Sequence, residues 1–86
     1  MGQLSYIVLD VLKPHEPSIT ELGKKITEYK KVKKVKINVY ATDKKTENVK
    51  ISVEGKDLEY LKIKEIIESQ SSVIHSVDEV TIQSSK

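Results

Sequence analysis

Residues 35–53, VKINVYATDKKTENVKISV, contain two stretches in which apolar and polar side chains alternate. An alternation with a period of two is typical of strands that bury one face and expose the other. The segment TDKKTE between the two stretches is polar, which is typical of the turn between neighbouring strands. The sequence therefore predicts an antiparallel hairpin with strands at residues 35–41 and 49–53.

A helix is predicted on each side of this hairpin. At the start of residues 18–31, Ser18 and Glu21 have the spacing of a capping box. Residues 58–69 also repeat apolar side chains at helical spacing. Gly23 lies beside the apolar stripe of the first helix, where we expect the missing side chain to let the helix approach the sheet closely. That stripe consists of Ile19, Leu22, Ile26 and Tyr29.

Two further strands are predicted near the ends of the chain. Residues 4–12, LSYIVLDVL, are almost continuously apolar, which is typical of a central strand. Pro14 and Pro17 follow in a constrained loop, because proline neither donates to a ladder nor continues a helix. Residues 73–82, VIHSVDEVTI, form the last strand, and we expect residues 83–86 to be frayed.

The predicted order of strand, helix, strand, strand, helix, strand is typical of a ferredoxin-like βαββαβ sandwich of the α+β class. Right-handed crossovers place both helices on one face of a four-stranded antiparallel sheet, with the first and third strands in the middle. No linker divides the chain, so residues 1–86 are predicted to form a single domain.

The composition limits the functions that this domain can have. All 15 basic residues are lysine, against 13 acidic residues, and the net charge is +2. Because cysteine is absent, we expect no disulfide and a cytoplasmic location. No apolar run approaches the ~20 residues that span a bilayer, so no membrane segment is expected. The chain lacks GxSxG and Walker A motifs and any arginine that could hold a phosphate, which favours a non-enzymatic protein.

The predicted topology gathers several possible ligands at one end of the sheet. The end of the first strand lies beside the beginnings of the third and fourth strands, and the proline-containing loop rises from the same edge. Imidazole nitrogens and carboxylate oxygens together suit divalent metals. We therefore predict a site for a divalent metal or a small polar ligand, formed from Asp10, His15, Glu16, Glu47 and His75.

An alternative interpretation needs no ligand at this end of the sheet. His15 and Glu16 also fit solvated loop residues, and none of the five candidates has the spacing of a metal-binding motif. Asp10 is the most informative candidate, because a carboxylate inside an apolar central strand is costly to bury without a partner. Its charge must be compensated by the protein, by an ion or by a neighbouring subunit.

Lysines are concentrated between residues 24 and 36, whereas the last third of the chain is mostly acidic. An alternative function is therefore weak nucleic-acid binding without sequence specificity, through Lys30, Lys31, Lys33 and Lys34. The lack of arginine and of an RNP-type motif makes this the less favoured alternative. These lysines also fit a structural role, since they complement the helix dipole and protect an edge strand.

Self-association is predicted from apolar residues that the helices cannot cover. Tyr6 and Val8 should lie on the open face of the sheet, with Leu4 and Leu12 at its ends. The apolar residues of the last strand fall into two sets on opposite faces, so only one set can enter the core. A large exposed apolar surface on a small domain usually marks an interface. The two sets are Val73 and Val77, and Ile74, Val80 and Ile82.

Three segments carry a resemblance to a known family, namely VLDVLKPHEPSITEL (8–22), TENVKISVEGKDLEY (46–60) and VIHSVDEV (73–80). Together they resemble the small archaeal family called domain of unknown function 211. The resemblance implies a ferredoxin-like fold, homo-oligomeric rings and no established biochemical activity. A composition rich in lysine, glutamate and isoleucine also suits a protein from a hot environment.

Overall fold

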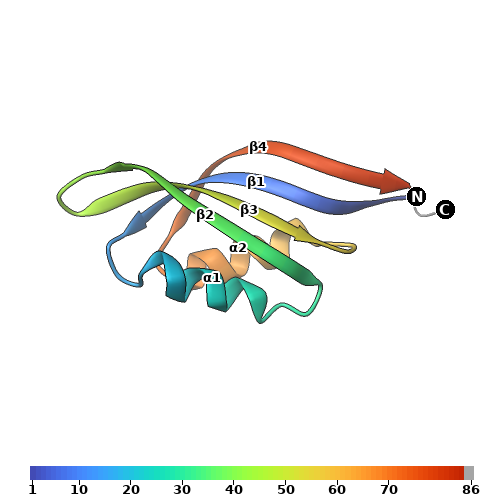
Figure 1. Cartoon of the computed structure of the whole chain (residues 1–86), viewed down its shortest axis with the longest axis horizontal. Coiled ribbons are helices and arrows are strands. Elements are labelled where there is room, and N and C mark those ends of the chain that lie inside the picture. The colour runs from blue at the N-terminus through green and yellow to red at the C-terminus, as the bar shows by residue number, and fades with distance from the viewer. Residues whose placement is uncertain (85–86) are drawn as a thin grey trace.

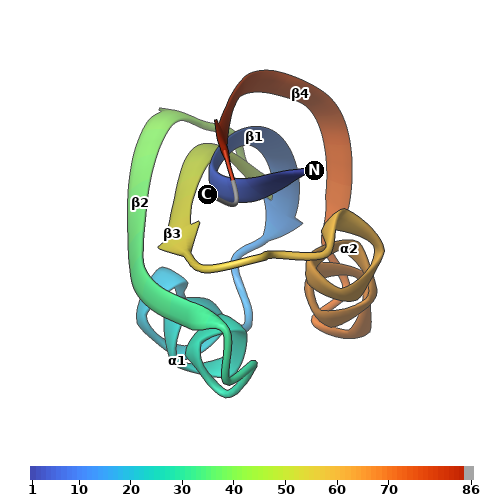
Figure 2. The same cartoon turned by 90° about the vertical axis from the view of Figure 1, so that its right-hand side faces the viewer.

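The computed structural model describes residues 1–84, and it confirms the predicted order of elements and the antiparallel sheet. The strand order is β2-β3-β1-β4, so β1 and β3 are central and β2 and β4 form the two edges. Figure 2 shows the sheet arching over both helices, which lie on the same side of it. The elements are β1 (Gly2–Pro14), α1 (Ile19–Thr27), β2 (Val32–Thr42), β3 (Thr46–Gly55), α2 (Tyr60–Ser69) and β4 (Val73–Ser84).

The core lies between the two central strands and the helices. Every second residue from Ile7 to Lys13 of β1 and from Val49 to Val53 of β3 is fully buried and faces the helices, whereas the intervening residues face the open side of the sheet. This is the pattern that a half-buried strand produces. The main core residues are Ile7, Leu9 and Val11 of β1, Val49, Ile51 and Val53 of β3, Leu22 and Ile26 of α1, and Ile63 and Ile67 of α2.

The capping box predicted for the first helix is confirmed. The backbone N–H of Glu21 donates to Ser18 Oγ over 3.2 Å, and the Glu21 carboxylate accepts from the Ser18 backbone N–H over 3.4 Å. The helix is shorter than the predicted 18–31, because it ends at Thr27 and a turn follows. In this turn the Tyr29 carbonyl accepts from Val32 N–H, which begins β2.

Two predictions about packing are corrected by the structure. Leu4 packs against the core and does not lie on the open face, because the register between β1 and β4 shifts between Leu4 and Tyr6. Such a bulge moves a side chain to the other face of the sheet. Gly23 is not needed for close packing, since a Cβ there would lie 3.5 Å from Ile37 Cδ1, an ordinary contact distance.

The last strand is longer than the sequence pattern predicts. Gln83 and Ser84 pair with Gln3 and Gly2, so β4 continues through the first half of the segment expected to fray. Residues 85–86 of that segment lie outside the described residues. Neither helix within residues 1–84 has the length and apolarity needed to cross a membrane.

Candidate functional site

The five candidate ligands predicted from the sequence fall into separate groups. His15 and Glu47 meet at the end of the sheet, as predicted. Asp10 lies on the open face, whereas Glu47 pairs with the core-facing Lys13 and so lies on the helix side. The end of the sheet therefore carries two polar clusters, one on each face.

The first cluster, which we call the hairpin clamp, joins Lys13, His15 and Glu47. Lys13 continues the core-facing row of β1, and its side chain is 0% exposed. Its Nζ donates to Glu47 Oε1 over 3.1 Å and to the Pro14 carbonyl over 2.7 Å. The buried ammonium thus has two acceptors, as a buried charge requires. Sequence analysis missed this role, although the two-residue period of β1 places Lys13 in line with Ile7, Leu9 and Val11.

His15 completes the clamp on the solvent side. Its Nδ1 lies 3.2 Å from Glu47 Oε2, and its Nε2 lies 3.1 Å from the Asp43 carbonyl and 3.0 Å from the Lys44 carbonyl. All of these oxygens are acceptors, so both ring nitrogens can donate only when the imidazole is protonated. His15 therefore ties the loop after β1 to the turn between β2 and β3.

The same contacts shift the pKa values of the clamp. The hydrogen bond to Glu47 and those to the turn carbonyls raise the pKa of His15 above its ordinary value. The hydrogen bond from Lys13, followed by the one from His15, lowers the pKa of Glu47. The charged forms of both side chains are thus favoured in the folded protein.

The second cluster, which we call the sheet-face network, crosses all four strands on the open face. Asp10 Oδ1 accepts from the Tyr40 hydroxyl over 2.7 Å, and Asp10 Oδ2 lies 3.7 Å from Lys50 Nζ. Lys50 also pairs with Asp78, whose other oxygen accepts from Ser76 Oγ over 2.7 Å. The charge of Asp10 is therefore compensated by the protein itself, one of the three possibilities that the sequence left open.

This network also shifts pKa values in the directions expected of paired charges. The hydrogen bond to Asp10 raises the pKa of Tyr40. The hydrogen bond between Lys50 and Asp78 raises the pKa of Lys50 and, together with Ser76, lowers that of Asp78. Sequence analysis did not identify Tyr40, Lys50 or Asp78 as partners of Asp10.

The remaining two candidates join neither cluster through a hydrogen bond. His75 is exposed, and its described effect is a favourable charge interaction with Asp78. Glu16 is exposed in the loop after β1. Within residues 1–84, no group of three or more histidine or acidic side chains is arranged to hold a metal ion.

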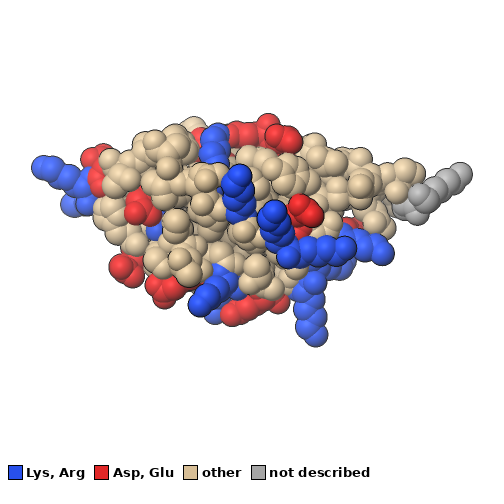
Figure 3. All heavy atoms as spheres, viewed as in Figure 1, with Lys and Arg blue, Asp and Glu red and all other residues tan. Residues whose placement is uncertain are grey.

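The lysines named for the nucleic-acid alternative lie at and after the end of α1. Lys31 is paired, with its Nζ 3.4 Å from Asp57 and 3.8 Å from Glu59, and the Asp57 hydrogen bond raises its pKa. Lys30, Lys31 and Lys33 line a hollow of about 430 Å³ with Gln3, Lys56 and Asp57. Lys34 points to a different part of the surface, on the open face of β2. Figure 3 shows lysine side chains standing along β2 and below its start.

The fold and these clusters define a small ferredoxin-like α+β protein. A family model described as an uncharacterized ArCR family, domain of unknown function 211, matches residues 5–85. An uncharacterized protein of Methanocaldococcus jannaschii is 51% identical over 80 residues, which cover 93% of this chain and 82% of that protein. The chain therefore belongs to this family of unknown function, with an archaeal relative, which confirms the resemblance found in the sequence.

Proposed function

We propose that the chain is a non-enzymatic cytoplasmic module that works as a homo-oligomer, with a second copy of the chain packed on β4. The observation that carries this proposal is a row of exposed large apolar side chains on this edge strand, between 46% and 58% exposed. An exposed apolar surface of this kind is typical of an interface. We call the row the β4 strip, and it consists of Val77, Val80 and Ile82, which pair with Leu9, Ile7 and Leu4 on the helix side of β1.

The end of the strip is exposed because the C-terminal part of β4 extends past both helices, as Figure 1 shows. Val77 and Val80 pair with the core-facing Leu9 and Ile7, yet both stay about half exposed. The prediction that Val77 lies with Val73 on the face opposite Val80 is therefore wrong, because the register between β1 and β4 shifts between Val8 and Leu9. From β4, Ile74 packs against the core. A long edge strand with apolar side chains offers both unpaired backbone groups and apolar area to another strand.

The charges of the two edge strands favour a second copy of the chain as the partner. Residues 32–42 of β2 carry lysines and no acidic residue, whereas residues 73–84 of β4 carry Asp78 and Glu79 and no lysine. Complementary edges favour head-to-tail association. Repetition of such a contact closes into a ring when the rotation between subunits allows it.

Light scattering coupled to size-exclusion chromatography tests the proposal. The protein should have a mass several times 9.8 kDa, and Val80→Lys with Ile82→Lys should lower this mass. The matched control is Leu61→Lys, because Leu61 is 72% exposed on α2, outside the strip. A concentration-independent monomer, or an equal effect of the control, contradicts self-association through β4.

Metal or small-ligand binding at Asp10, His15, Glu16, Glu47 and His75 stays a prediction. The structure favours it less than self-association, because Asp10 and His15 already have protein partners. Calorimetric titration with a divalent metal checks it: binding should weaken in Asp10→Asn and His75→Ala. Unchanged binding in both variants, or none in the parent protein, removes this site.

A further inference from the structure

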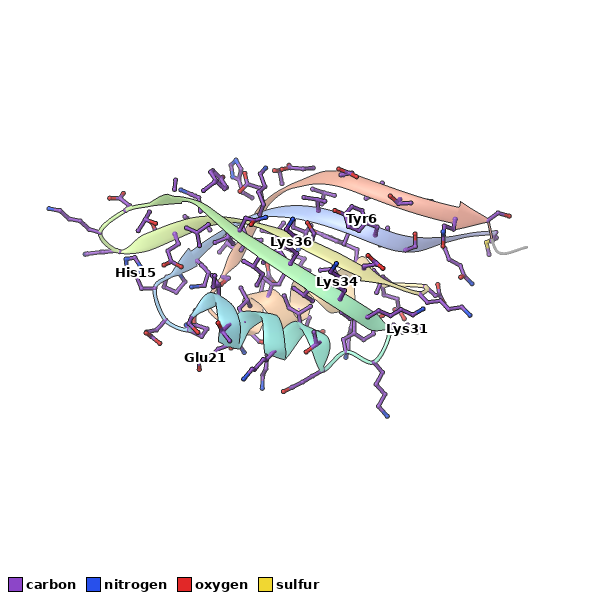
Figure 4. The ribbon with its side chains drawn as sticks, in the orientation of Figure 1. Tyr6, His15, Glu21, Lys31, Lys34 and Lys36 are labelled. Atoms are coloured by element: carbon purple, nitrogen blue, oxygen red, sulfur yellow. The ribbon has the colours of Figure 1, made fainter. Side chains whose placement is uncertain are left out.

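Beyond self-association, an aromatic ring and several lysines meet on the open face of the sheet. Tyr6 of β1 lies opposite Glu54 of β3, which lies opposite Lys34 of β2. In the next row on the same face, Ser52 lies opposite Lys36. These five residues line a hollow of about 220 Å³. Figure 4 shows Tyr6, Lys34 and Lys36 on neighbouring parts of the sheet, far from His15 and Glu21.

A second hollow of about 310 Å³ adjoins the first one. Tyr6 and Glu54 line both hollows, and the second is completed by Ser5, Lys33, Gly55 and Gln83. The half-buried Tyr6 ring therefore stands between two depressions, each with lysine at its rim. The hollows of about 220 and 310 Å³ lie below and at the low end of the ~300–1,000 Å³ range of ligand pockets, so each fits one part of a ligand.

The charged side chains around Tyr6 are not paired with other described side chains of the domain. Lys33, Lys34, Lys36 and Glu54 make no side-chain hydrogen bond or ion pair within residues 1–84. In contrast, Lys50 on the same face pairs with both Asp10 and Asp78. Unpaired lysines beside a hollow are available to an anionic ligand, whereas paired ones must first give up their partners.

We propose that these adjoining hollows bind a nucleotide unit, with its base on the Tyr6 ring and its phosphate on the lysines. Aromatic side chains bind bases by stacking without regard to sequence, and lysine binds phosphate as a point charge. Glu54 accepts hydrogen bonds from a ribose hydroxyl or an exocyclic amino group. This assignment is independent of the β4 strip, and it replaces Lys30 and Lys31 of the nucleic-acid alternative with Tyr6, Lys36 and Glu54.

Tyr6 is the aromatic residue among those that line the two hollows. One ring stacks one base, so the site takes a free nucleotide or a single nucleotide of a single strand. Both sources present the same chemistry of a base next to a phosphate. They are distinguished by comparing ATP with a short oligouridylate, with tripolyphosphate as the ligand that lacks a base.

The experiment measures binding of these three ligands to the full chain by calorimetry. Tyr6→Leu should weaken ATP or oligouridylate binding about tenfold, the order expected for one stacked base, whereas Tyr6→Phe should retain it. Lys34→Gln with Lys36→Gln should weaken binding and reduce the salt dependence by about 1.4 in log–log slope for two phosphate contacts on a single strand. The matched control, Lys44→Gln with Lys45→Gln, removes the same charge from the β2–β3 turn.

A measurement on the unaltered protein covers the case in which Tyr6→Leu does not fold. The ring-proton resonances of Tyr6 should shift upfield when ATP or oligouridylate is added, and not when tripolyphosphate is added. Binding of ATP alone identifies a free nucleotide as the ligand, and binding of oligouridylate alone identifies a single strand. Absence of binding, or tripolyphosphate binding as tight as that of ATP and oligouridylate, overturns the proposal. It is also overturned if ATP or oligouridylate binds but Tyr6→Leu does not weaken that binding and the Tyr6 resonances do not move.

Discussion

Tyr40 donates its hydroxyl to Asp10 over 2.7 Å, although strand β3 separates the two strands that carry these residues. Lys50 of β3 lies between them, with its Nζ 3.7 Å from Asp10 Oδ2 and 5.6 Å from the centre of the Tyr40 ring. The carboxylate of the central strand is thus held by a phenol and an ammonium from two other strands. The charge that interrupts the apolar sequence of the first strand is thereby paired within the sheet.

Breaking this relationship should weaken the fold in a coupled way. We expect Tyr40→Phe and Asp10→Asn each to lower the free energy of unfolding, because each removes one side of a hydrogen bond to a charged group. The double variant should lose less than the sum of the two, since the second substitution finds the bond already absent. Urea denaturation of the parent, the two single variants and the double variant gives the coupling free energy between Tyr40 and Asp10.

Glu79→Gln is the control for this cycle, because Glu79 lies on β4 in no described ion pair within residues 1–84. It should leave the denaturation midpoint close to that of the parent protein. Strict additivity of the Tyr40 and Asp10 substitutions would show that the two side chains do not interact in solution.

The hairpin clamp predicts a pH dependence of stability. Because folding raises the pKa of His15, its stabilisation is complete below the ordinary value of 6.5 and is lost as the pH rises through the folded-state pKa. Folding lowers the pKa of Glu47, so its stabilisation is present above the ordinary value of 4.5 and is lost as the pH falls through the folded-state pKa. The clamp should therefore stabilise the fold most between these ordinary values.

Thermal unfolding of His15→Gln at several pH values checks this expectation. As the pH rises from about 6 to 8, where histidine titrates, the melting temperature of the variant should fall less than that of the parent protein. His75→Gln is the matched control, since the exposed His75 makes no described hydrogen bond. If the melting temperatures of the two variants change with pH in the same way, the contacts of His15 do not cause the pH dependence of stability.

The architecture could be predicted from the sequence because hydrophobic periods determine it. The two-residue alternation at 35–41 and 49–53 lies within β2 and β3, and the Ser18–Glu21 spacing marks the start of α1. The hydrophobic pattern could not predict where the register between paired strands shifts. The shift between Leu4 and Tyr6 moves Leu4 to the core, and no residue type in that segment signals it.

The candidate site was only partly predictable, for a related reason. Topology brings β1, β3 and β4 together at one end, and this correctly joined His15 to Glu47. The partners of Asp10 depend on exact register, and the β2–β3 ladder shifts between Val39 and Ala41, next to Tyr40. Without this register, Tyr40 could not be assigned to Asp10.

The capping box of α1 predicts a stability effect of known size. Ser18→Ala should lower the free energy of unfolding by about 1 kcal/mol, because the Glu21 N–H loses its acceptor. Ser18→Thr keeps a hydroxyl at this position and should retain most of the stability. Chemical denaturation compares the three proteins, and an unchanged midpoint in Ser18→Ala would mean that solvent replaces the cap without loss.

Replacing the glycines at positions 23 and 55 by alanine should change the free energy of unfolding in opposite directions. In Gly23→Ala the new Cβ meets Ile37 Cδ1 at 3.5 Å, an ordinary contact, inside a helix where alanine is favoured. We expect a gain of about 0.5–1 kcal/mol. In Gly55→Ala the Cβ overlaps the Lys31 carbonyl oxygen, which accepts from Lys56 N–H, and lies 2.7 Å from Leu58 Cδ2.

The clash at position 55 involves backbone, so a rotamer change does not relieve it. Gly55→Ala should therefore lower the free energy of unfolding by about 1–3 kcal/mol, the usual range for overpacking. Thermal and urea denaturation of both variants measure the difference. A stabilised Gly55→Ala would mean that the turn joining α1 to β2 moves away from β3 without loss, and a destabilised Gly23→Ala would mean that α1 does approach β2 as closely as the sequence predicted.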